Sequence, residues 1–241
     1  MSEAQLNVSF PGESDEYRSA RNDLLEAEIA LRRQIEAVAA QRRSLPLGGE
    51  VRTDYRFEEA APGTNDSTST HLSELFAPGK DTLFLYSFMF IPADGRPLGA
   101  ACPSCTSIID AIDGAAPHIS QRISFAVVAK APIERFRAHA QSRGWRHARL
   151  LSSANNTYNR DYQAEAPDGS QLPMATVFAR RDGKIHHFWS SELFLVPPEP
   201  GQDPRHVDFM WPLWSVLDRT PDGRGTDWRP ALTYEARSKA R

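Results

Sequence analysis

Both cysteines of this chain lie in one short stretch, GACPSCTSI, at residues 99–107. Only Pro103 and Ser104 separate Cys102 from Cys105. A Cys-x-x-Cys pair of this kind has three explanations: a redox-active dithiol, half of a metal site, or two small side chains packed in a core. The residues around the pair, and the elements that hold it, bear on each explanation.

The redox explanation follows from the position of the pair in the expected structure. The cysteines come after the apolar run DTLFLYSFMFIP (81–92), which is typical of a strand buried on both faces, and they open a helical segment. Unpaired N–H groups and the helix dipole at a helix N-terminus favour a thiolate over a thiol. Cys105, one turn further on, is placed to resolve a mixed disulfide. We therefore expect Cys102 to be the more acidic and more exposed thiol.

The metal explanation requires further ligands. Twelve residues separate Cys105 from His118, as in a zinc finger, but the second histidine should then follow within residues 122–124, which are Arg, Ile and Ser. The chain has no other cysteine to complete a four-cysteine site. A structural zinc site would need His186 or His187 to reach the thiols, so we predict no resident metal.

The sequence pattern of peroxiredoxins is absent. Those enzymes carry a threonine three residues and a proline seven residues before the attacking cysteine, whereas this chain has Gly99 and Gly95 there. Peroxide reduction by the peroxiredoxin mechanism is therefore disfavoured.

The composition sets limits on the partners. Hydrophobic residues make up 40% of the 241 residues, enough for a packed core, and the formal net charge of −3 gives no reason to expect nucleic acid as a partner. The longest apolar run, residues 83–91, falls far short of the roughly 20 residues that span a membrane. The N-terminus lacks the basic and apolar regions of an export signal. We expect a cytoplasmic protein, in a compartment that keeps thiols reduced.

Residues 14–43 are predicted to form a long amphipathic helix. Ser14 is a suitable N-cap, Arg42 and Arg43 suit the last turn, and no glycine or proline interrupts the segment. Apolar residues recur every seven positions, at Tyr17, Leu24, Leu31, Val38 and Leu45. Such a stripe packs either on the helix's own domain or on a second subunit. We predict a homodimer with this helix at or beside the interface.

The rest of the chain alternates between expected strands and helices. A short strand at 55–57 and a solvated loop at 62–70 precede the cysteine strand. After the cysteine helix the sequence predicts a strand at 123–132, a helix at 132–144, a strand at 148–153, a hairpin at 174–190 and a terminal helix within 206–219 that Pro212 bends or begins. Alternation followed by a hairpin predicts an α/β fold with a mixed central sheet and helices on both faces.

The strand–Cys-x-x-Cys–helix unit, followed by Pro173 and the hairpin, resembles the thioredoxin superfamily. Residues 15–235 also resemble a bacterial thioredoxin-like family, the domain-of-unknown-function family numbered 899. The matching stretches are EYRSARNDLLEAEIALRRQ, SFMF before CPSC, YNRDY, and HVDFMWPLWSVLDRTPDGRG. The resemblance implies a thioredoxin-like sandwich with a C-terminal helical extension over residues 47–235, an N-terminal helix at 14–46 and a tail at 236–241.

The resemblance also implies a site. It implies a dithiol–disulfide oxidoreductase without a cofactor, in which Cys102 attacks a disulfide-bearing or thiol substrate and Cys105 resolves. Pro173 takes the cis-proline position, so a cis Leu172–Pro173 bond is expected beside the sulfurs, with the Leu172 backbone docking the substrate. Thioredoxins have Gly-Pro between the cysteines and a buried aspartate in the preceding strand. That strand has no carboxylate here, which leaves water or Asp94 as the proton carrier.

Two other functions fit the same residues. A thioredoxin-fold copper carrier would hold Cu(I), which prefers soft thiolates, between the cysteine pair and a histidine. An interaction module would keep the fold and use the helix at 14–43. Elsewhere, Arg160 and Asp161 are expected to form a local ion pair. Trp211 and Trp214 are expected to lie in the core or, as aromatic residues near a loop-rich end, to line a pocket.

Overall fold

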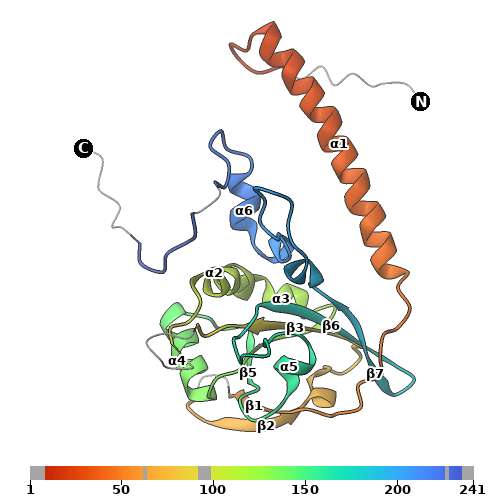
Figure 1. Cartoon of the computed structure of the whole chain (residues 1–241), viewed down its shortest axis with the longest axis vertical. Coiled ribbons are helices and arrows are strands. Elements are labelled where there is room, and N and C mark those ends of the chain that lie inside the picture. The colour runs from red at the N-terminus through yellow and green to blue at the C-terminus, as the bar shows by residue number, and fades with distance from the viewer. Residues whose placement is uncertain (1–8, 62–63, 92–98, 226–227, 235–241) are drawn as a thin grey trace. The chain divides into compact units, whose positions relative to one another are not determined.

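The structure is a computed structural model that describes residues 9–61, 64–91, 99–225 and 228–234. The chain divides into two compact units, residues 1–46 and 47–241 (Figure 1). The described part of the first unit contains helix α1, and the second unit contains the sheet. Asp94, Gly95 and the tail expected at 236–241 lie outside the described residues.

Helix α1 (Asp15–Arg43) begins and ends where the sequence predicts. Ser14 caps it, since its side-chain oxygen accepts a hydrogen bond from the Tyr17 N–H at 3.1 Å. None of its residues is buried, and the apolar stripe is open: Leu24 is 52% and Leu31 59% exposed. Tertiary packing normally supplies most of the stability of an amphipathic helix, so this stripe is a surface that lacks its packing partner within the described unit.

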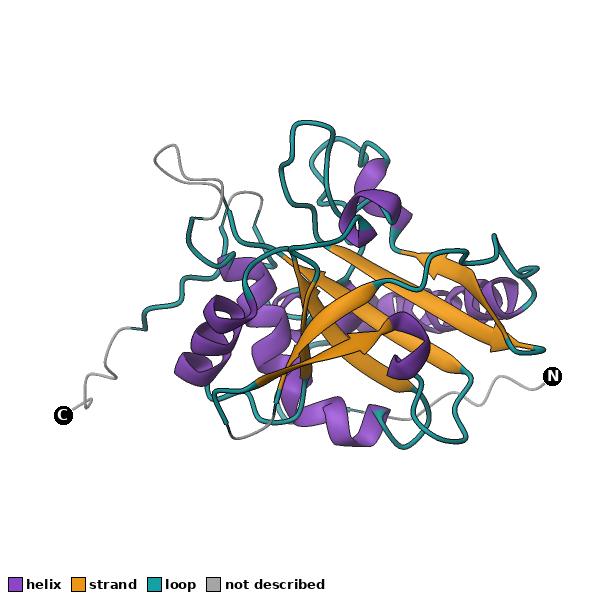
Figure 2. Ribbon diagram, turned by 90° about the horizontal axis from the view of Figure 1, so that it is seen from below, coloured by secondary structure: helices purple, strands orange, loops and turns teal. Residues whose placement is uncertain are grey.

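The second unit is built on a seven-stranded sheet with the order β2-β1-β5-β4-β3-β6-β7 (Figure 2). Strands β3, β4 and β5 run parallel, while β6 and β7 on one side and β1 and β2 on the other are antiparallel to their neighbours. The strands are β1 (Arg56–Ala60), β2 (Ser67–His71), β3 (Thr82–Phe88), β4 (Ser124–Ala129), β5 (Arg149–Ser152), β6 (Met174–Arg181) and β7 (Lys184–Ser190).

Helices cover both faces of this sheet because its central strands are apolar on both sides. On β3, Tyr86 and Phe88 belong to a core cluster with residues of α2, α4 and α6, whereas Leu83 and Leu85 belong to a second cluster with residues of η1 and α5. The helices are α2 (Pro103–Ile112), α3 (Ala116–Ile119), α4 (Ile133–Arg143), α5 (Tyr158–Asp161) and α6 (Pro212–Leu217), and the short 3₁₀ helices are η1 (Leu72–Leu75), η2 (Asp113–Ala115), η3 (Glu192–Leu195) and η4 (Asp208–Met210). This arrangement is an α/β sandwich with a mixed central sheet and helices on both faces, as the alternation in the sequence predicts.

Several expected boundaries are confirmed by their backbone chemistry. Gly144 ends α4 with a φ of 76°, the left-handed conformation in which glycine carries no steric penalty. Asp182 and Gly183 both have positive φ, 51° and 75°, as a two-residue hairpin turn between β6 and β7 requires.

One expectation about an element was wrong. Residues 67–70, expected in a loop, belong to strand β2, because they pair with β1 at the edge of the sheet and need no apolar alternation there. Of the two roles expected for Pro212, bending or beginning the terminal helix, it has the second: Pro212 begins α6, and the residues before it form the separate helix η4.

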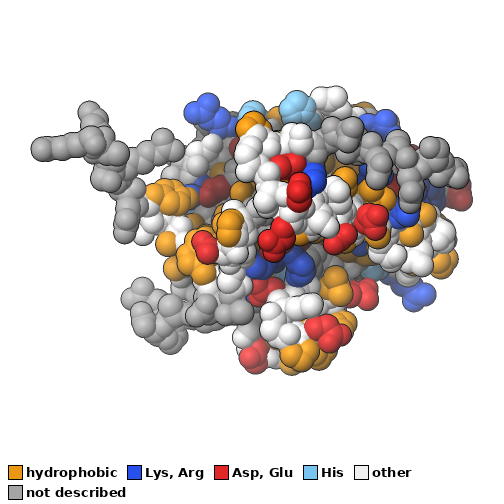
Figure 3. Space-filling model, turned by 90° about the horizontal axis from the view of Figure 1, so that it is seen from above, with side chains coloured by type: hydrophobic (Ala, Val, Ile, Leu, Met, Phe, Trp, Pro, Cys, Tyr) orange, Lys and Arg blue, Asp and Glu red, His pale blue; other side chains and the backbone are white. Residues whose placement is uncertain are grey.

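The surface carries both signs of charge. Figure 3 shows acidic and basic side chains of the described residues exposed on the face that it draws. Within the part of the chain that the structure describes, no helix is both long enough and apolar enough to cross a membrane.

Candidate active site

Cys102 is the N-cap residue of α2, at the point where the chain returns to the end of β3. Its N–H donates to the Met89 carbonyl at 3.0 Å, and its own carbonyl accepts from the N–H and the hydroxyl of Thr106 at 2.9 and 2.8 Å. Pro103 occupies the first helical position, where the missing N–H would have had no helical partner. The backbone of Cys102 is therefore fixed on both sides of its side chain.

The Cys102 sulfur lies where donors converge. A hydrogen bond from the Cys105 side chain, together with the backbone N–H groups of Cys105 and Ser104, lowers the pKa of Cys102 to about 6, against the opposing effect of burial. The Cys105 N–H lies 3.5 Å from the Cys102 sulfur. Proline at 103 leaves this stabilisation in place, because the two N–H groups that follow supply it. Cys102 is thus largely a thiolate at pH 7.

Cys105 has the opposite character. Burial, followed by its contact with Cys102, raises the pKa of Cys105 well above its usual value, while the hydroxyl of buried Tyr86 donates to its sulfur at 3.3 Å and opposes the rise. The order of acidity is the one expected from the sequence. The difference in exposure is small, 5% for Cys102 and 1% for Cys105. The contacts of the Cys105 thiol among the described residues include the Tyr86 phenol and the Cys102 sulfur, and Asp94 lies outside those residues.

A pocket of about 220 Å³ lies over Cys102. One side of it consists of residues near the sheet and the cysteines, and the other consists of the segment 203–224, here called the C-terminal cap, with Arg229. The lining residues are Met89, Cys102, Ser104, Pro173, Phe194, Asp203, Pro204, Arg205, His206, Val207, Asp208, Trp211, Trp214, Arg224 and Arg229. Cys105 is absent from this lining, so the pocket presents one thiol of the pair.

The C-terminal cap is anchored on the cysteine helix, and α6 lies beside α2 in Figure 1. The Trp211 indole N–H donates to the Ser107 hydroxyl of α2 at 3.0 Å. Trp211 and Trp214 are buried, 6% and 4% exposed, in the same core cluster as both cysteines. The prediction that these tryptophans lie in the core is confirmed, and so is the alternative that aromatic residues at this loop-rich end line a pocket. The position of that pocket over Cys102, and its lining by Phe194, were not predicted.

Pro173 lies at this pocket, but the expected cis bond was wrong. No cis peptide bond occurs in the described residues, so the Leu172–Pro173 bond is trans. The physical reason is the local pairing that leads into β6: the Leu172 N–H donates to the Ala164 carbonyl at 2.9 Å, and Gln171 bridges Glu165. Since that N–H is already paired, substrate docking by the Leu172 backbone loses its basis.

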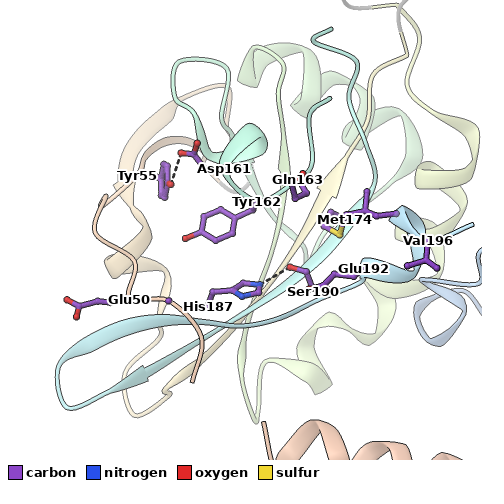
Figure 4. A pocket seen from close by; sticks show the side chains of 12 residues that line it. Glu50, Tyr55, Asp161, Tyr162, Gln163, Met174, His187, Ser190, Glu192 and Val196 are labelled. Atoms are coloured by element: carbon purple, nitrogen blue, oxygen red, sulfur yellow. Dashed lines mark hydrogen bonds between the residues drawn. The ribbon is translucent and has the colours of Figure 1, made fainter. Parts of the chain in front are cut away.

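A second, larger pocket of about 480 Å³ contains none of the predicted site residues (Figure 4). Its polar groups satisfy one another: the Tyr55 hydroxyl donates to Asp161 at 2.8 Å, and His187 lies 2.9 Å from the Ser190 hydroxyl. Thr157 also donates to Asp161, and no Arg160–Asp161 ion pair forms in the described part of the chain, so that prediction was wrong. The carboxylate is held by two hydroxyls instead.

The histidines considered as metal ligands lie elsewhere. His187 belongs to the larger pocket, and His186 contacts the Gly48 carbonyl at 3.2 Å. Among the residues that the structure describes, no group of three or more His, Cys, Asp or Glu side chains is placed to hold a metal ion.

Comparison with solved structures finds distant matches to peroxiredoxins. Peroxidoxin BcpB from Mycobacterium tuberculosis is 18% identical, with 69% of this chain and 94% of that chain covered and a TM-score of 0.43. The reduced 2-Cys peroxiredoxin of Plasmodium vivax is 19% identical, with 68% and 95% covered and a TM-score of 0.44. AhpC of Enterococcus faecalis is 10% identical, with 71% and 93% covered and a TM-score of 0.44.

No curated protein matches the chain. A family profile does match, over residues 8–239, which is nearly the whole length. It is the profile described as bacterial protein of unknown function (DUF899), and the chain belongs to that family.

Proposed function

We propose that this protein is a dithiol–disulfide oxidoreductase in which Cys102 attacks and Cys105 resolves. The observation that carries the proposal is the contrast within the pair: a thiol with a pKa of about 6 at the base of a pocket, and a buried thiol of raised pKa directly behind it. An attacking thiol works best when its pKa is near the ambient pH, and the second thiol should stay protonated until it is needed.

The reaction balances with the two thiols alone. The Cys102 thiolate attacks one sulfur of a substrate disulfide, the substrate S–S bond breaks, and the second substrate sulfur leaves as a thiolate that takes a proton. Cys105 then loses its proton, and its sulfur attacks Cys102 in the mixed disulfide. The first substrate sulfur leaves, so two electrons have passed from the protein dithiol to the substrate disulfide.

Single-cysteine variants test the proposal. Reduced wild-type protein, mixed with hydroxyethyl disulfide, should lose both free thiols and form an internal disulfide that mass spectrometry of peptides assigns to residues 102 and 105. Cys105→Ser should stall as a mixed disulfide on Cys102. The matched variant Cys102→Ser should form no adduct at pH 7. Wild-type protein that forms no disulfide but binds Cu(I) would overturn the proposal in favour of metal transport.

We also propose that the protein is cytoplasmic and acts as a homodimer through α1. The compartment follows from the chemistry, because a dithiol that is to be used again needs a reducing environment. The dimer follows from the exposed stripe at seven-residue spacing, which includes Tyr17, Leu24 and Leu31.

Sedimentation tests the assembly. The double variant Leu24→Glu, Leu31→Glu should be monomeric at concentrations where wild-type protein is dimeric, since it places charges in the stripe. Asn22→Glu, on the opposite side of the same helix, is the matched control and should remain dimeric. A monomeric wild-type protein at micromolar concentration overturns this part of the proposal without affecting the thiol chemistry.

A further inference from the structure

The substrate must come to Cys102 through a small opening. The Cys102 residue is only 5% exposed, and the space next to it is a pocket of about 220 Å³. Pockets for drug-sized ligands occupy ~300–1,000 Å³, so this one takes a smaller molecule. Disulfide exchange requires the substrate sulfur to bond with the Cys102 sulfur at ~2.05 Å, which obliges the substrate disulfide to enter the pocket.

The outer wall of the pocket is a built part of the fold. Val207, Met210, Trp211 and Trp214 of the C-terminal cap are all buried in the core cluster that contains the cysteines. Arg205 and Arg224 each form ion pairs with Asp208 and Asp218, which tie the two ends of the cap together. A protein substrate would have to displace this wall before its disulfide reached Cys102.

The inner surface is mainly aromatic and apolar. Trp211 and Trp214 form an edge-to-face pair with their ring centres 5.0 Å apart, and Phe194 packs on His206 at 4.8 Å. Met89 and Pro173 complete the apolar lining near the sulfur. Such walls favour the planar or aliphatic body of a small organic molecule.

The charged groups of the pocket are already paired. Besides the pairs within the cap, Arg229 lies 2.6 Å from Asp203. Burial lowers the pKa of His206 to about 4, so that ring is uncharged at pH 7. The three arginines that line the pocket, Arg205, Arg224 and Arg229, are therefore all engaged with carboxylates.

Resting on the proposed function, we infer that the substrates are small, uncharged disulfides with an apolar or aromatic body, and that disulfides of folded proteins are excluded. The inference joins three observations: the narrow space over Cys102, its aromatic walls and its paired charges. Phe194, which lines this pocket from η3, is the specificity residue most easily changed, because it is only half-buried.

The test compares three disulfides under single-turnover conditions at pH 7. Dipyridyl disulfide is small, aromatic and uncharged; dithiobis(nitrobenzoate) is aromatic but carries two carboxylates; insulin holds its disulfides in a folded protein. Each rate constant is divided by that of free glutathione with the same disulfide, which removes differences in intrinsic reactivity. We expect the normalised rate to be at least ten times higher for dipyridyl disulfide than for the carboxylated compound, and to be lowest for insulin.

Phe194→Ala should raise the half-saturating concentration of dipyridyl disulfide several-fold, while Leu193→Ala should not. Leu193 is the matched control because it is the neighbouring residue, is 59% exposed and does not line the pocket. Equal normalised rates for insulin and dipyridyl disulfide, or an unchanged Phe194→Ala protein, would overturn the substrate class while leaving the dithiol chemistry standing. Failure of all three compounds to oxidise the wild-type protein would instead overturn the proposed function.

Discussion

The two pockets of the second unit differ in the state of their polar groups: those of one are hydrogen-bonded to each other, and the other holds an activated thiol. The larger pocket, of about 480 Å³, is rich in titratable side chains, yet these are hydrogen-bonded within the pocket: Tyr55 to Asp161, and His187 to Ser190. The smaller one, of about 220 Å³, is lined by one thiol, that of Cys102, whose pKa is lowered by three hydrogen-bond donors. The comparison teaches that a reactive site is located by an activated nucleophile with access to space, and that volume alone is a poor guide.

The largest expected effect is the loss of thiol chemistry in the smaller pocket. Cys102→Ser should abolish reaction with hydroxyethyl disulfide at pH 7, because a serine hydroxyl is not ionised there and Cys105 is buried with a raised pKa. Rapid-quench mass spectrometry measures the adduct. Residual reaction at the wild-type rate would mean that Cys105 is the attacking residue.

The next effect concerns pH. The rate of Cys102 alkylation by iodoacetamide should be constant above its pKa of about 6 and fall about tenfold per pH unit below it, since only the thiolate reacts. Cys105→Ser replaces the thiol that donates a hydrogen bond to the Cys102 sulfur, so the pKa of Cys102, read as the midpoint of the alkylation profile, should rise. If it returned to the free value of about 8.5, the thiolate fraction at pH 7 would fall roughly thirtyfold.

A pH midpoint near 8.5 in the wild-type protein would contradict the activation of Cys102 by its donors. Measuring the oxidised protein in parallel provides the control, because neither sulfur can then be alkylated.

A smaller effect is expected for the phenol behind the pair. Tyr86→Phe keeps the ring that packs in the core but removes the donor that lowers the pKa of Cys105. Loss of one hydrogen bond of about 1 kcal/mol should slow resolution of the mixed disulfide roughly fivefold. The attack by Cys102, measured as the burst of the first thiol released from the substrate, should be nearly unchanged. General damage to the fold would slow both steps, so an unchanged burst assigns Tyr86 a role in resolution.

The smallest effect belongs to the larger pocket. Tyr55→Phe removes the hydrogen bond to Asp161 and should lower the free energy of unfolding by about 1 kcal/mol, measured by urea denaturation. The reaction of Cys102 with disulfides should not change. A slowed reaction in this variant would break the distinction between the two pockets.

The sequence was most informative where local chemistry decides the structure. Ser14 at the start of α1, Gly144 at the end of α4 and the Asp182-Gly183 turn each set their element through their own backbone or side-chain preference. The acidity of Cys102 was predictable for the same reason, since its donors are the next residues of the same helix turn.

The parts that escaped prediction depend on contacts between distant residues. Trp211 contacts Ser107, 104 positions away, so the sequence could mark this aromatic-rich stretch as core or as the lining of a pocket, but could not place that pocket at Cys102. Tyr86, whose hydroxyl contacts Cys105, could not be distinguished in the sequence from the other apolar residues of a buried strand. The cis bond at Pro173 was inferred from resemblance, and the pairing of Leu172 with Ala164 was not visible in the sequence.

The cysteine site is attached to β3, and this attachment determines at which stage of unfolding the site loses its geometry. β3 is an interior strand, hydrogen-bonded to β4 on one edge and to β6 on the other, and it carries Tyr86 while its continuation at Met89 holds Cys102. Amides of such strands exchange with solvent only in the rarest openings of a protein, whereas segments with few ladder bonds open often. The cysteine pair is therefore coupled to the most cooperative part of the unit. On heating, the two thiols should keep their relative positions until the sheet itself unfolds.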